Sequence, residues 1–169
     1  LGYIGRVEEL KGITTLLNTF ISMEDIDIEL HLYGKINYDV SLYLEKMEFF
    51  SNKKLFLHGF FNDISTCMSN IDIFIFPSYH EGLPFSILES MYYGIPCITT
   101  NVGGIPEIIT DNETGILVEP KNEHQLLEKI MLLITNKNLA IEIGQNAKKY
   151  FELALSNKAF NSTINQIIK

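Results

Sequence analysis

Two glutamates at a defined spacing are the first residues that could do chemistry. Glu81 lies in a turn that reads Glu-Gly-Leu-Pro, and seven residues separate it from Glu89. The sequence predicts a helix over Phe85–Tyr93, whose first free amides would form a site for a phosphate or another anion. Two carboxylates beside that site would repel an anion unless they bind hydroxyl groups of the same ligand. A nucleotide sugar carries both groups, so the pattern favours such a ligand over the plainer interpretation that both glutamates are solvated.

Two cations are the next candidates. Arg6 and Lys11 flank the turn that follows the first predicted strand, and Gly12 permits a close backbone approach at the start of a helix. An arginine offers a rigid fork of donors and a lysine a compact charge, and both suit phosphate oxygens. Either residue alone would be interpreted as a solvated surface cation. They become candidates because their turn is expected to open at the same edge of a sheet as Glu81.

Elements on both sides of the glutamate pair must position it. Residues 71–76 form an apolar run without a helical period, which is typical of a central parallel strand. Gly94 and Pro96 end the helix that follows, and a second strand-like run occupies 97–100. Glycine-bearing loops follow both strands, and they are expected at the carboxyl edge of the sheet, where α/β proteins bind ligands. For the glycines that follow strands, the geometry of the turn itself is the competing explanation.

The rest of the chain alternates between strand-like and helix-like segments. This order predicts an α/β fold, a doubly wound parallel sheet of about six strands in the Rossmann-like class. Asp63 and Asn122 are predicted to cap helices. The other strands are expected at 1–7, 28–33, 54–58 and 114–118, and the other helices at 13–23, 40–50, 63–68, 105–109, 123–134, 138–151 and 156–168, with a helical tail over about 138–169.

Composition excludes several classes of partner. The chain has 169 residues, a formal net charge of −8 and 46% hydrophobic residues, so a single folded globular domain is expected. Nucleic acid needs a clustered basic surface and anionic lipid attracts basic segments, so neither is an expected partner. No apolar run approaches the roughly 18 residues that a membrane span needs, so none is expected. A small phosphate ligand stays compatible because it needs only a few cations and amides.

Cysteine, glycine and histidine patterns exclude other chemistries. Cys67 and Cys97 lie in apolar settings and are expected as reduced core thiols rather than a disulfide or metal ligands. Gly2 and Gly5 do not complete the G-x-G-x-x-G fingerprint of nicotinamide binding, and the G-x-x-x-x-G-K-[ST] loop is absent from the sequence. The histidines are not spaced as metal ligands. For His80, which precedes the glutamate turn, a ligand-binding and a structural role both stay open.

With these residues assembled, the chain resembles the C-terminal donor-binding domain of the retaining family 4 glycosyltransferases, also described as glycosyl transferases group 1. The resemblance covers nearly the whole chain and is weaker over the helical tail. It is carried by the motifs Pro77-Ser78-x-x-Glu81-Gly82-Leu83-Pro84-x-x-x-x-Glu89 and Gly94-x-Pro96 followed by Gly103-Gly104-x-Pro106-Glu107. It implies one half of a GT-B fold, with a donor-binding domain over 1–169 and an N-terminal acceptor domain that is absent from the chain.

The resemblance also implies roles for single residues. Arg6, Lys11 and Glu81 match catalytic positions: the two cations bind the donor diphosphate and stabilise the leaving nucleoside diphosphate, and the glutamate contacts the transferred sugar or its oxocarbenium-like state. Glu89 is expected to bind the ribose hydroxyls. The other expected donor-binding residues are Gly34, His58, Gly59, Phe60, Ser78, Gly82, Leu83, Pro84 and Phe85. The family places a second glycine soon after the first of these, where this chain has Lys35-Ile36.

The reaction implied is retaining transfer of a sugar from a UDP- or GDP-linked donor to a sugar or lipid-linked acceptor. Two cations and helix-start amides would neutralise the leaving diphosphate without a metal cofactor. The acceptor would bind to the absent domain, so the isolated chain is expected to bind donor nucleotide but not to transfer sugar. The expected setting is bacterial surface polysaccharide synthesis, in the cytoplasm or at the inner face of the membrane in the full-length protein.

Three other interpretations stay open. A sugar-nucleotide 2-epimerase of similar fold would hold a nucleoside diphosphate here but would need further acid and base residues in the cleft. A non-catalytic binding module would keep the pocket, although it would not need all four charged candidates together. A flavodoxin-like signalling domain would need an acidic cluster after the first strand, and Glu8 with Glu9 is the only hint of one.

Overall fold

Six parallel strands form one sheet, in the order β3-β2-β1-β4-β5-β6. The chain order reverses between β1 and β4, which is the switch point of a doubly wound fold. This arrangement confirms the predicted fold class. In the computed structural model, which describes residues 1–23, 26–48 and 54–154, the strands are β1 (Gly2–Ile4), β2 (Glu29–Tyr33), β3 (Lys54–Gly59), β4 (Phe74–Phe76), β5 (Cys97–Thr100) and β6 (Ile116–Val118).

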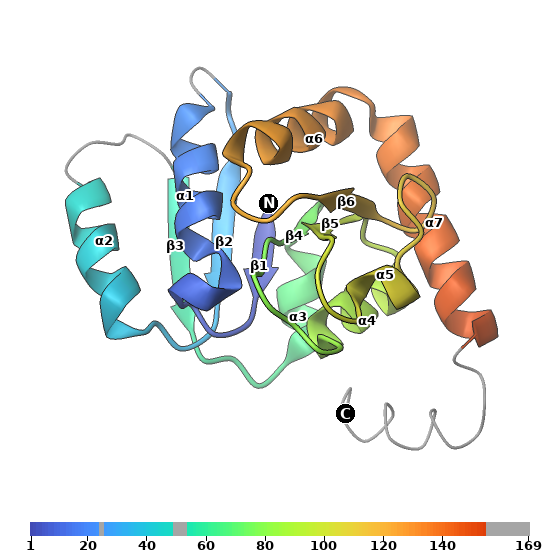
Figure 1. The fold of residues 1–169 in the computed structure, drawn as a ribbon, viewed down its shortest axis with the longest axis horizontal. Helices are drawn as coiled ribbons and strands as arrows, with labels where there is room; N and C mark the ends of the chain where they lie inside the picture. Colours follow the sequence, from blue (N-terminus) through green and yellow to red (C-terminus); the bar gives the residue numbers. More distant parts are fainter. Residues whose placement is uncertain (24–25, 49–53, 155–169) are drawn as a thin grey trace.

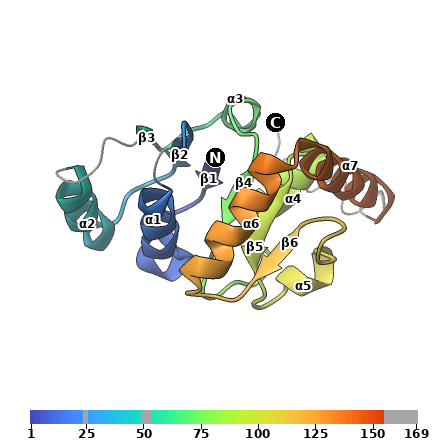
Figure 2. The same cartoon turned by 90° about the horizontal axis from the view of Figure 1, so that it is seen from above.

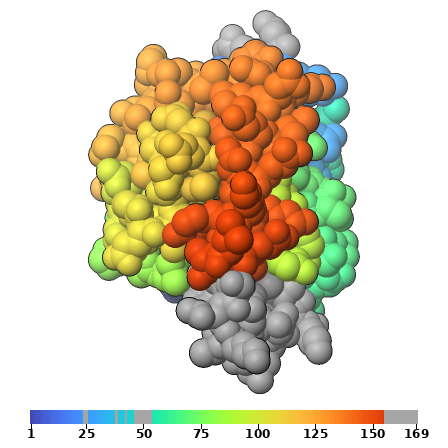
Figure 3. All heavy atoms as spheres, turned by 90° about the vertical axis from the view of Figure 1, so that its right-hand side faces the viewer, coloured from blue at the N-terminus to red at the C-terminus, as the bar shows by residue number. Residues whose placement is uncertain are grey.

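Helices cover both faces of this sheet (Figure 1). One layer has α1 packed against α6, and the other has α4 packed against α7, as the view from above shows (Figure 2). In the space-filling view α7 lies across one side of the molecule, next to the α5 segment (Figure 3). The helices are η1 (Glu9–Lys11, a 3₁₀ turn), α1 (Ile13–Ser22), α2 (Tyr38–Glu48), α3 (Ile64–Ser69), α4 (Phe85–Tyr93), α5 (Ile105–Ile108), α6 (Glu123–Thr135) and α7 (Lys137–Ala154).

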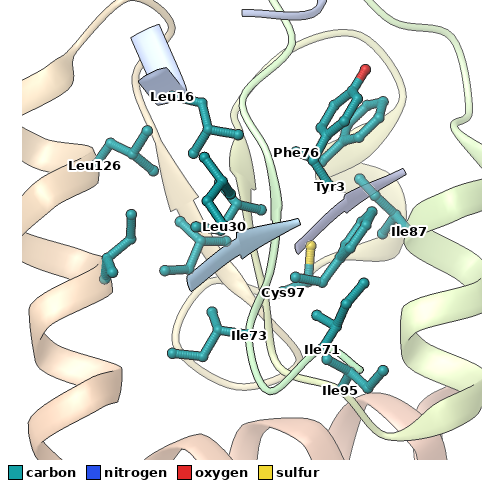
Figure 4. Close-up of a cluster of buried hydrophobic side chains, with 14 of the residues drawn as sticks. Tyr3, Leu16, Leu30, Ile71, Ile73, Phe76, Ile87, Ile95, Cys97 and Leu126 are labelled. Carbon is teal, nitrogen blue, oxygen red and sulfur yellow. The ribbon is translucent and has the colours of Figure 1, made fainter. Parts of the chain in front are cut away.

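The core fills the space between the sheet and each helical layer. Figure 4 shows Leu16, Leu30 and Leu126 gathered on the α1–α6 side, and the rings of Tyr3 and Phe76 on the side of α4. These two rings stack with their centroids 5.7 Å apart, directly below the carboxyl edge of β1 and β4. Large apolar groups therefore fix the two central strands from both faces.

Both cysteines are buried and free, as predicted. Burial raises the pKa of the Cys67 thiol to about 11 and that of the Cys97 thiol to about 12. A thiol with so high a pKa carries almost no thiolate at neutral pH, so these groups behave as small apolar side chains. Among the helices of the described segments, none combines the length and the apolarity that a bilayer crossing requires.

The predicted strands are longer than the observed ones by two or three residues at three places. β4 begins at Phe74 rather than at residue 71, because the amide of Ile71 still bonds to the Met68 carbonyl, 3.1 Å away, at the end of α3. β6 begins at Ile116 because the preceding residues close a turn, in which the Thr114 amide bonds back to residue 110 at 3.0 Å. β1 ends at Ile4 instead of residue 7, because the chain turns there into the loop that carries Arg6. The predicted helix over 156–168 lies outside the described residues.

Both predicted helix caps are present. Asp63 accepts a hydrogen bond from the Ser65 amide at 3.0 Å at the start of α3, and Asn122 accepts one from the Gln125 amide at 3.0 Å at the start of α6. Each side chain satisfies one of the free amides that a helix exposes at its first turn. The cap on α6 fixes the end of the helix that lies nearest to α1, where Asn18 donates to the Glu123 carboxylate at 2.6 Å.

Replacement of the α6 cap should therefore destabilise the domain measurably. We expect Asn122→Ala to lower the free energy of unfolding by about 1 kcal/mol, because the Gln125 amide loses its acceptor. Urea denaturation of the purified chain measures this change. The matched control is Asn146→Ala on the exposed face of α7, which removes no cap. Equal stability of the two variants would contradict the capping role.

Candidate functional site

The site lies at the switch point, where the loops that follow β1 and β4 touch through their backbones. The Tyr79 amide donates to the Leu10 carbonyl at 3.0 Å. Gly12 lies so close to the β4 loop that a Cβ atom on it would be 1.9 Å from the Pro77 carbonyl oxygen, and its φ of 69° also favours glycine. A side chain at this position would force the loops apart. The sequence predicted that Gly12 permits a close backbone approach, and the fold shows that the loop after β4 is what approaches it, beside the Lys11–Glu81 contact.

Lys11 and Glu81 form an ion pair between the two loops. The Lys11 Nζ contacts Glu81 Oε1, and the two side chains are only 16% and 11% exposed. A pair so well shielded from water is stronger than a surface pair, because solvent and salt screen it less. The structure thus joins two of the three predicted catalytic residues directly, although they are 70 positions apart in the chain.

Arg6, the third predicted catalytic residue, stands at the same edge but faces solvent. Its side chain is 67% exposed, and its Nη2 lies 3.1 Å from Oε1 of Glu8. The Tyr3 hydroxyl donates to the Arg6 backbone carbonyl at 2.7 Å. Burial raises the pKa of Tyr3, the Glu81 and Glu8 carboxylates raise it further, and the Arg6 charge opposes them. All three charged groups therefore act on one phenol beneath the loops.

A third loop, after β5, closes on the Glu81 turn. The Gly104 amide donates to the Gly82 carbonyl at 2.9 Å. Gly103 has φ 55°, and a Cβ atom on it would lie 1.8 Å from the Glu81 carbonyl oxygen. Glycine is therefore required here for a steric reason as well as for the turn. Without side chains, Gly103 and Gly104 let the loop after β5 contact the backbone of Glu81 and of the exposed Gly82.

Ser78, one of the predicted donor-binding residues, joins the loops from below. Its side chain is fully buried, and its hydroxyl lies 3.2 Å from the carbonyl oxygens of Leu10 and His80. Its own carbonyl accepts a hydrogen bond from the Thr100 hydroxyl. The structure thus gives Ser78 a role in holding its own loop to η1 and to the end of β5, whereas the side chain of His80 is exposed.

Helix α4 presents its first amides and Glu89 beside this turn. No side chain caps α4, whose N-cap residue is Pro84, so its first amides are available to an anion. Glu89 is partly buried, and burial raises the pKa of its carboxyl group. Pro84 is buried, while Leu83 and Phe85 are exposed at the rim. Leu83, Pro84 and Phe85 thus lie at the start of α4, with Pro84 packed inward and the other two side chains facing solvent.

Four predicted residues lie on the other side of β1, at the carboxyl ends of β2 and β3: Gly34, His58, Gly59 and Phe60. The Gly34 amide donates to the Gly59 carbonyl at 2.7 Å, which joins the loops after these strands. His58 is largely exposed, but its ring stacks on that of Tyr33, with centroids 4.2 Å apart. Partial loss of water around the ring and, second, the nearby His31 lower the pKa of His58. Phe60 is 79% exposed. This half of the edge is more open than the Lys11–Glu81 half.

The sequence did not identify Glu8 as a functional candidate, yet its carboxylate is buried at this edge. Asn37, from the loop after β2, donates to Glu8 Oε2 at 2.8 Å. The same loop forms a parallel bridge between Val7 and Ile36. The burial of Glu8 depends on that distant loop, so its neighbours in sequence carry no signal of it.

Two further features bear on the chemistry. Within the segments that the structure describes, no three His, Cys, Asp or Glu side chains are grouped so as to hold a metal ion. A cavity of about 880 Å³ lies at the opposite, amino edge of the sheet, where Ile28, Ile71, Ile95 and Leu133 contribute to its walls. None of the predicted site residues lines it, so its volume does not bear on the carboxyl-edge site.

Comparisons with known proteins agree with this architecture. The capsular polysaccharide biosynthesis glycosyltransferase CapM of Staphylococcus aureus is 30% identical over 161 residues, which are 94% of this chain and 42% of that protein. An N-acetylgalactosaminyltransferase of Campylobacter jejuni, named for a diphospho-undecaprenol-linked substrate, is 34% identical over 101 residues, 60% of this chain and 27% of that one. The chain thus spans less than half the length of these relatives.

Solved structures give the same result for the fold. The C-terminal domain of LpcC, a glycosyl transferase group 1 family protein from Francisella tularensis, superposes with a TM-score of 0.80 at 28% identity, over 94% of this chain and 84% of that one. HepE of Anabaena, solved in complex with UDP and glucose, gives 0.84 at 21% identity, over 98% of this chain and 46% of that one, and supports the fold alone. The family model of the glycosyl transferases group 1 matches residues 1–150. The chain therefore belongs to the glycosyl transferases group 1 family.

Proposed function

We propose that this chain is the donor-binding domain of a retaining glycosyltransferase, which holds a nucleoside-diphosphate sugar at the carboxyl edge of its sheet. The observation that carries this proposal is the shielded Lys11–Glu81 ion pair at the switch point, beside the uncapped start of α4. A diphosphate suits the cation and the helix amides, and the sugar hydroxyls suit the carboxylate. In a chain with a net charge of −8, a shielded cation and free helix amides at one edge form a local site that favours an anionic ligand.

The charged residues would divide the donor between them. Lys11 and Arg6 bind the diphosphate oxygens, Glu81 binds the sugar hydroxyls, and Glu89 on α4 binds the ribose. Because Glu81 already holds Lys11, the diphosphate competes with a carboxylate for the same ammonium group. The family resemblance implies that the cations Arg6 and Lys11 stabilise the charge of the departing nucleoside diphosphate. The shielded Lys11 and the helix-start amides are oriented in advance, so their orientation would cost little at the moment of reaction.

The remaining predicted residues would contact the rest of the donor. The open half of the edge, at the ends of β2 and β3, has room for the base, with an exposed ring at Phe60 and the stacked pair of Tyr33 and His58. Gly34 and Gly59 would border it through their backbones, and Gly82, Leu83, Pro84 and Phe85 would lie along the phosphates and the sugar. For Ser78 we propose support of these loops, since its hydroxyl is buried among carbonyl groups.

The relatives support a choice of donor and acceptor. HepE was solved with UDP and glucose, and an Escherichia coli relative is named as a UDP-galactose-dependent transferase acting on a diphospho-undecaprenol substrate. We therefore propose UDP-linked donors ahead of GDP-linked ones, with no metal cofactor, and a sugar or lipid-linked acceptor. That acceptor would bind to an N-terminal domain outside this chain. Surface polysaccharide synthesis at the cytoplasmic face of the membrane fits these relatives.

Nucleotide binding tests the proposal directly. We expect titration calorimetry of the purified chain to show binding of UDP in preference to GDP, ADP and NAD. Glu89→Ala should weaken UDP binding by about 2 kcal/mol or more, because a partly buried carboxylate no longer accepts from the ribose. Glu113→Ala, in the turn that enters β6 at the opposite edge of the sheet, is the matched control. Binding of NAD alone, or of no nucleotide, would refute the donor site.

The Lys11–Glu81 ion pair predicts opposite effects for its two members. Lys11→Gln should weaken UDP binding by roughly 2 kcal/mol or more, because the diphosphate loses a shielded charge. Glu81→Gln should tighten the binding of UDP, because it removes the carboxylate that competes for Lys11. Calorimetry of both variants with UDP measures these signs. A loss of UDP affinity in both would show that the pair acts as one structural unit instead.

The isolated chain should bind donor without turning it over. The acceptor and the groups opposite the donor are proposed to belong to another domain, so we expect no sugar transfer from UDP-glucose or UDP-N-acetylglucosamine to added acceptors. Chromatographic assay of released UDP and of glycosylated product checks this. Transfer by the 169 residues alone would overturn the proposed division of labour, and release of free monosaccharide by the full-length protein would favour the epimerase interpretation.

A further inference from the structure

Glu8 is a buried carboxylate to which the proposed function assigns no role. Its side chain is only 8% exposed and lies in the loop after β1, two residues from Arg6. Its Oε2 accepts a hydrogen bond from the Asn37 amide group at 2.8 Å. A carboxylate taken out of water is costly unless a charge compensates it. The compensating charge here is the guanidinium of Arg6.

The contact between Glu8 and Arg6 has an unusual form. The Arg6 Nη2 lies 3.1 Å from Glu8 Oε1, a buried oxygen that accepts no hydrogen bond from any residue that the structure describes. The contact is therefore an ion pair, and within residues 1–23, 26–48 and 54–154 the N–H donors of the Arg6 guanidinium make no hydrogen bond to another side chain. Since the Arg6 side chain is 67% exposed, those donors face the solvent at the carboxyl edge.

The backbone around this pair is fixed on both sides. The Tyr3 hydroxyl donates to the Arg6 carbonyl at 2.7 Å. The Val7 amide donates to the Lys35 carbonyl at 2.9 Å, and the Asn37 amide donates to the Val7 carbonyl at 2.9 Å. With the main chain held in this way, the remaining freedom of Arg6 lies in its long side chain. Glu8 is the charged group in contact with the end of that side chain.

We propose that Glu8 is a positioning residue that holds the Arg6 guanidinium over the diphosphate site with its donors free for phosphate oxygens. The inference rests on the proposed donor site and adds to it a residue that touches no ligand itself. Ordering a flexible side chain on binding costs conformational entropy, and a group that is ordered beforehand lowers this cost. Glu8 supplies that order from the buried side of Arg6.

The sign of the effect separates this role from a simple field effect. Glu8 is an anion close to a site for an anion. If it acted only through its field, removal of its charge would tighten the binding of UDP. If it positions Arg6, removal of its charge weakens the binding of UDP, although a repulsive charge has been lost. Glu8→Gln is the suitable change, because its side-chain oxygen can still accept from Asn37.

The test is calorimetry of UDP and of uridine with the wild-type chain and Glu8→Gln. We expect UDP to bind about fivefold more weakly to the variant and uridine to bind unchanged, because uridine has no phosphate for Arg6 to bind. Glu113→Gln, which removes the same charge from an exposed position at the opposite edge, should leave both affinities unchanged. Unchanged or tighter UDP binding by Glu8→Gln would overturn the inference while leaving the donor site intact.

A double-mutant cycle with Arg6→Ala shows whether Glu8 acts through the arginine. In that background Glu8→Gln should cause no further loss of UDP affinity, since the group to be positioned is gone and only the repulsion by the Glu8 charge is removed. An equal loss in both backgrounds, or an equal loss for UDP and uridine, would assign Glu8 a general structural role and refute the inference. Glu8→Asp keeps the negative charge but moves it away from Arg6. We expect its UDP affinity to lie between that of the wild-type chain and that of Glu8→Gln, with the net charge of the chain unchanged. Failure of the wild-type chain to bind UDP would refute the donor site itself, and this inference with it.

Discussion

The site depends on backbone atoms of separate loops that touch without a side chain between them. Gly12 against the Pro77 carbonyl and Gly103 against the Glu81 carbonyl leave no space for a Cβ atom, and hydrogen bonds between main-chain groups close the same gaps. This packing brings the loops after β1, β4 and β5 into one unit. Lys11 and Glu81 meet as a consequence of it, and their ion pair is shielded because the loops exclude water around it.

The carboxyl edge carries two cations, although the chain as a whole is negatively charged. The formal net charge is −8, so a phosphate ligand would be repelled by the protein as a whole. Arg6 and Lys11 face this edge, and each already has a carboxylate partner, Glu8 and Glu81 respectively. Screening at physiological ionic strength limits the reach of the distant charges to about 8 Å, so the groups at the edge decide what binds there. Discrimination among anions then depends on where these cations stand more than on how many there are.

The sequence predicted those features that depend on neighbours in the chain. Gly94 and Pro96 ended α4 as expected, both bounds of β5 were right, and the parallel order of strands placed Arg6, Lys11 and Glu81 at one edge. The direct Lys11–Glu81 contact and the burial of Glu8 could not be predicted, because each depends on two loops far apart in sequence. The start of β4 was misplaced for a local reason: the turn that ends α3 continues to Ile71, within an apolar run that looks like strand.

The join between β1 and β4 has a consequence for how the domain responds to occupancy. These strands share a single registered pair, Gly2 opposite Phe74, while their outer neighbours are joined over three or more. The two halves of the sheet are thus held together along a short seam, reinforced at its upper end by the loops that form the site. A molecule that binds to the loops after both β1 and β4 would add a further connection between the two halves of the sheet. Ligand binding at the site should therefore raise the free energy of unfolding of the domain, and the size of that increase reports how fully the site is occupied.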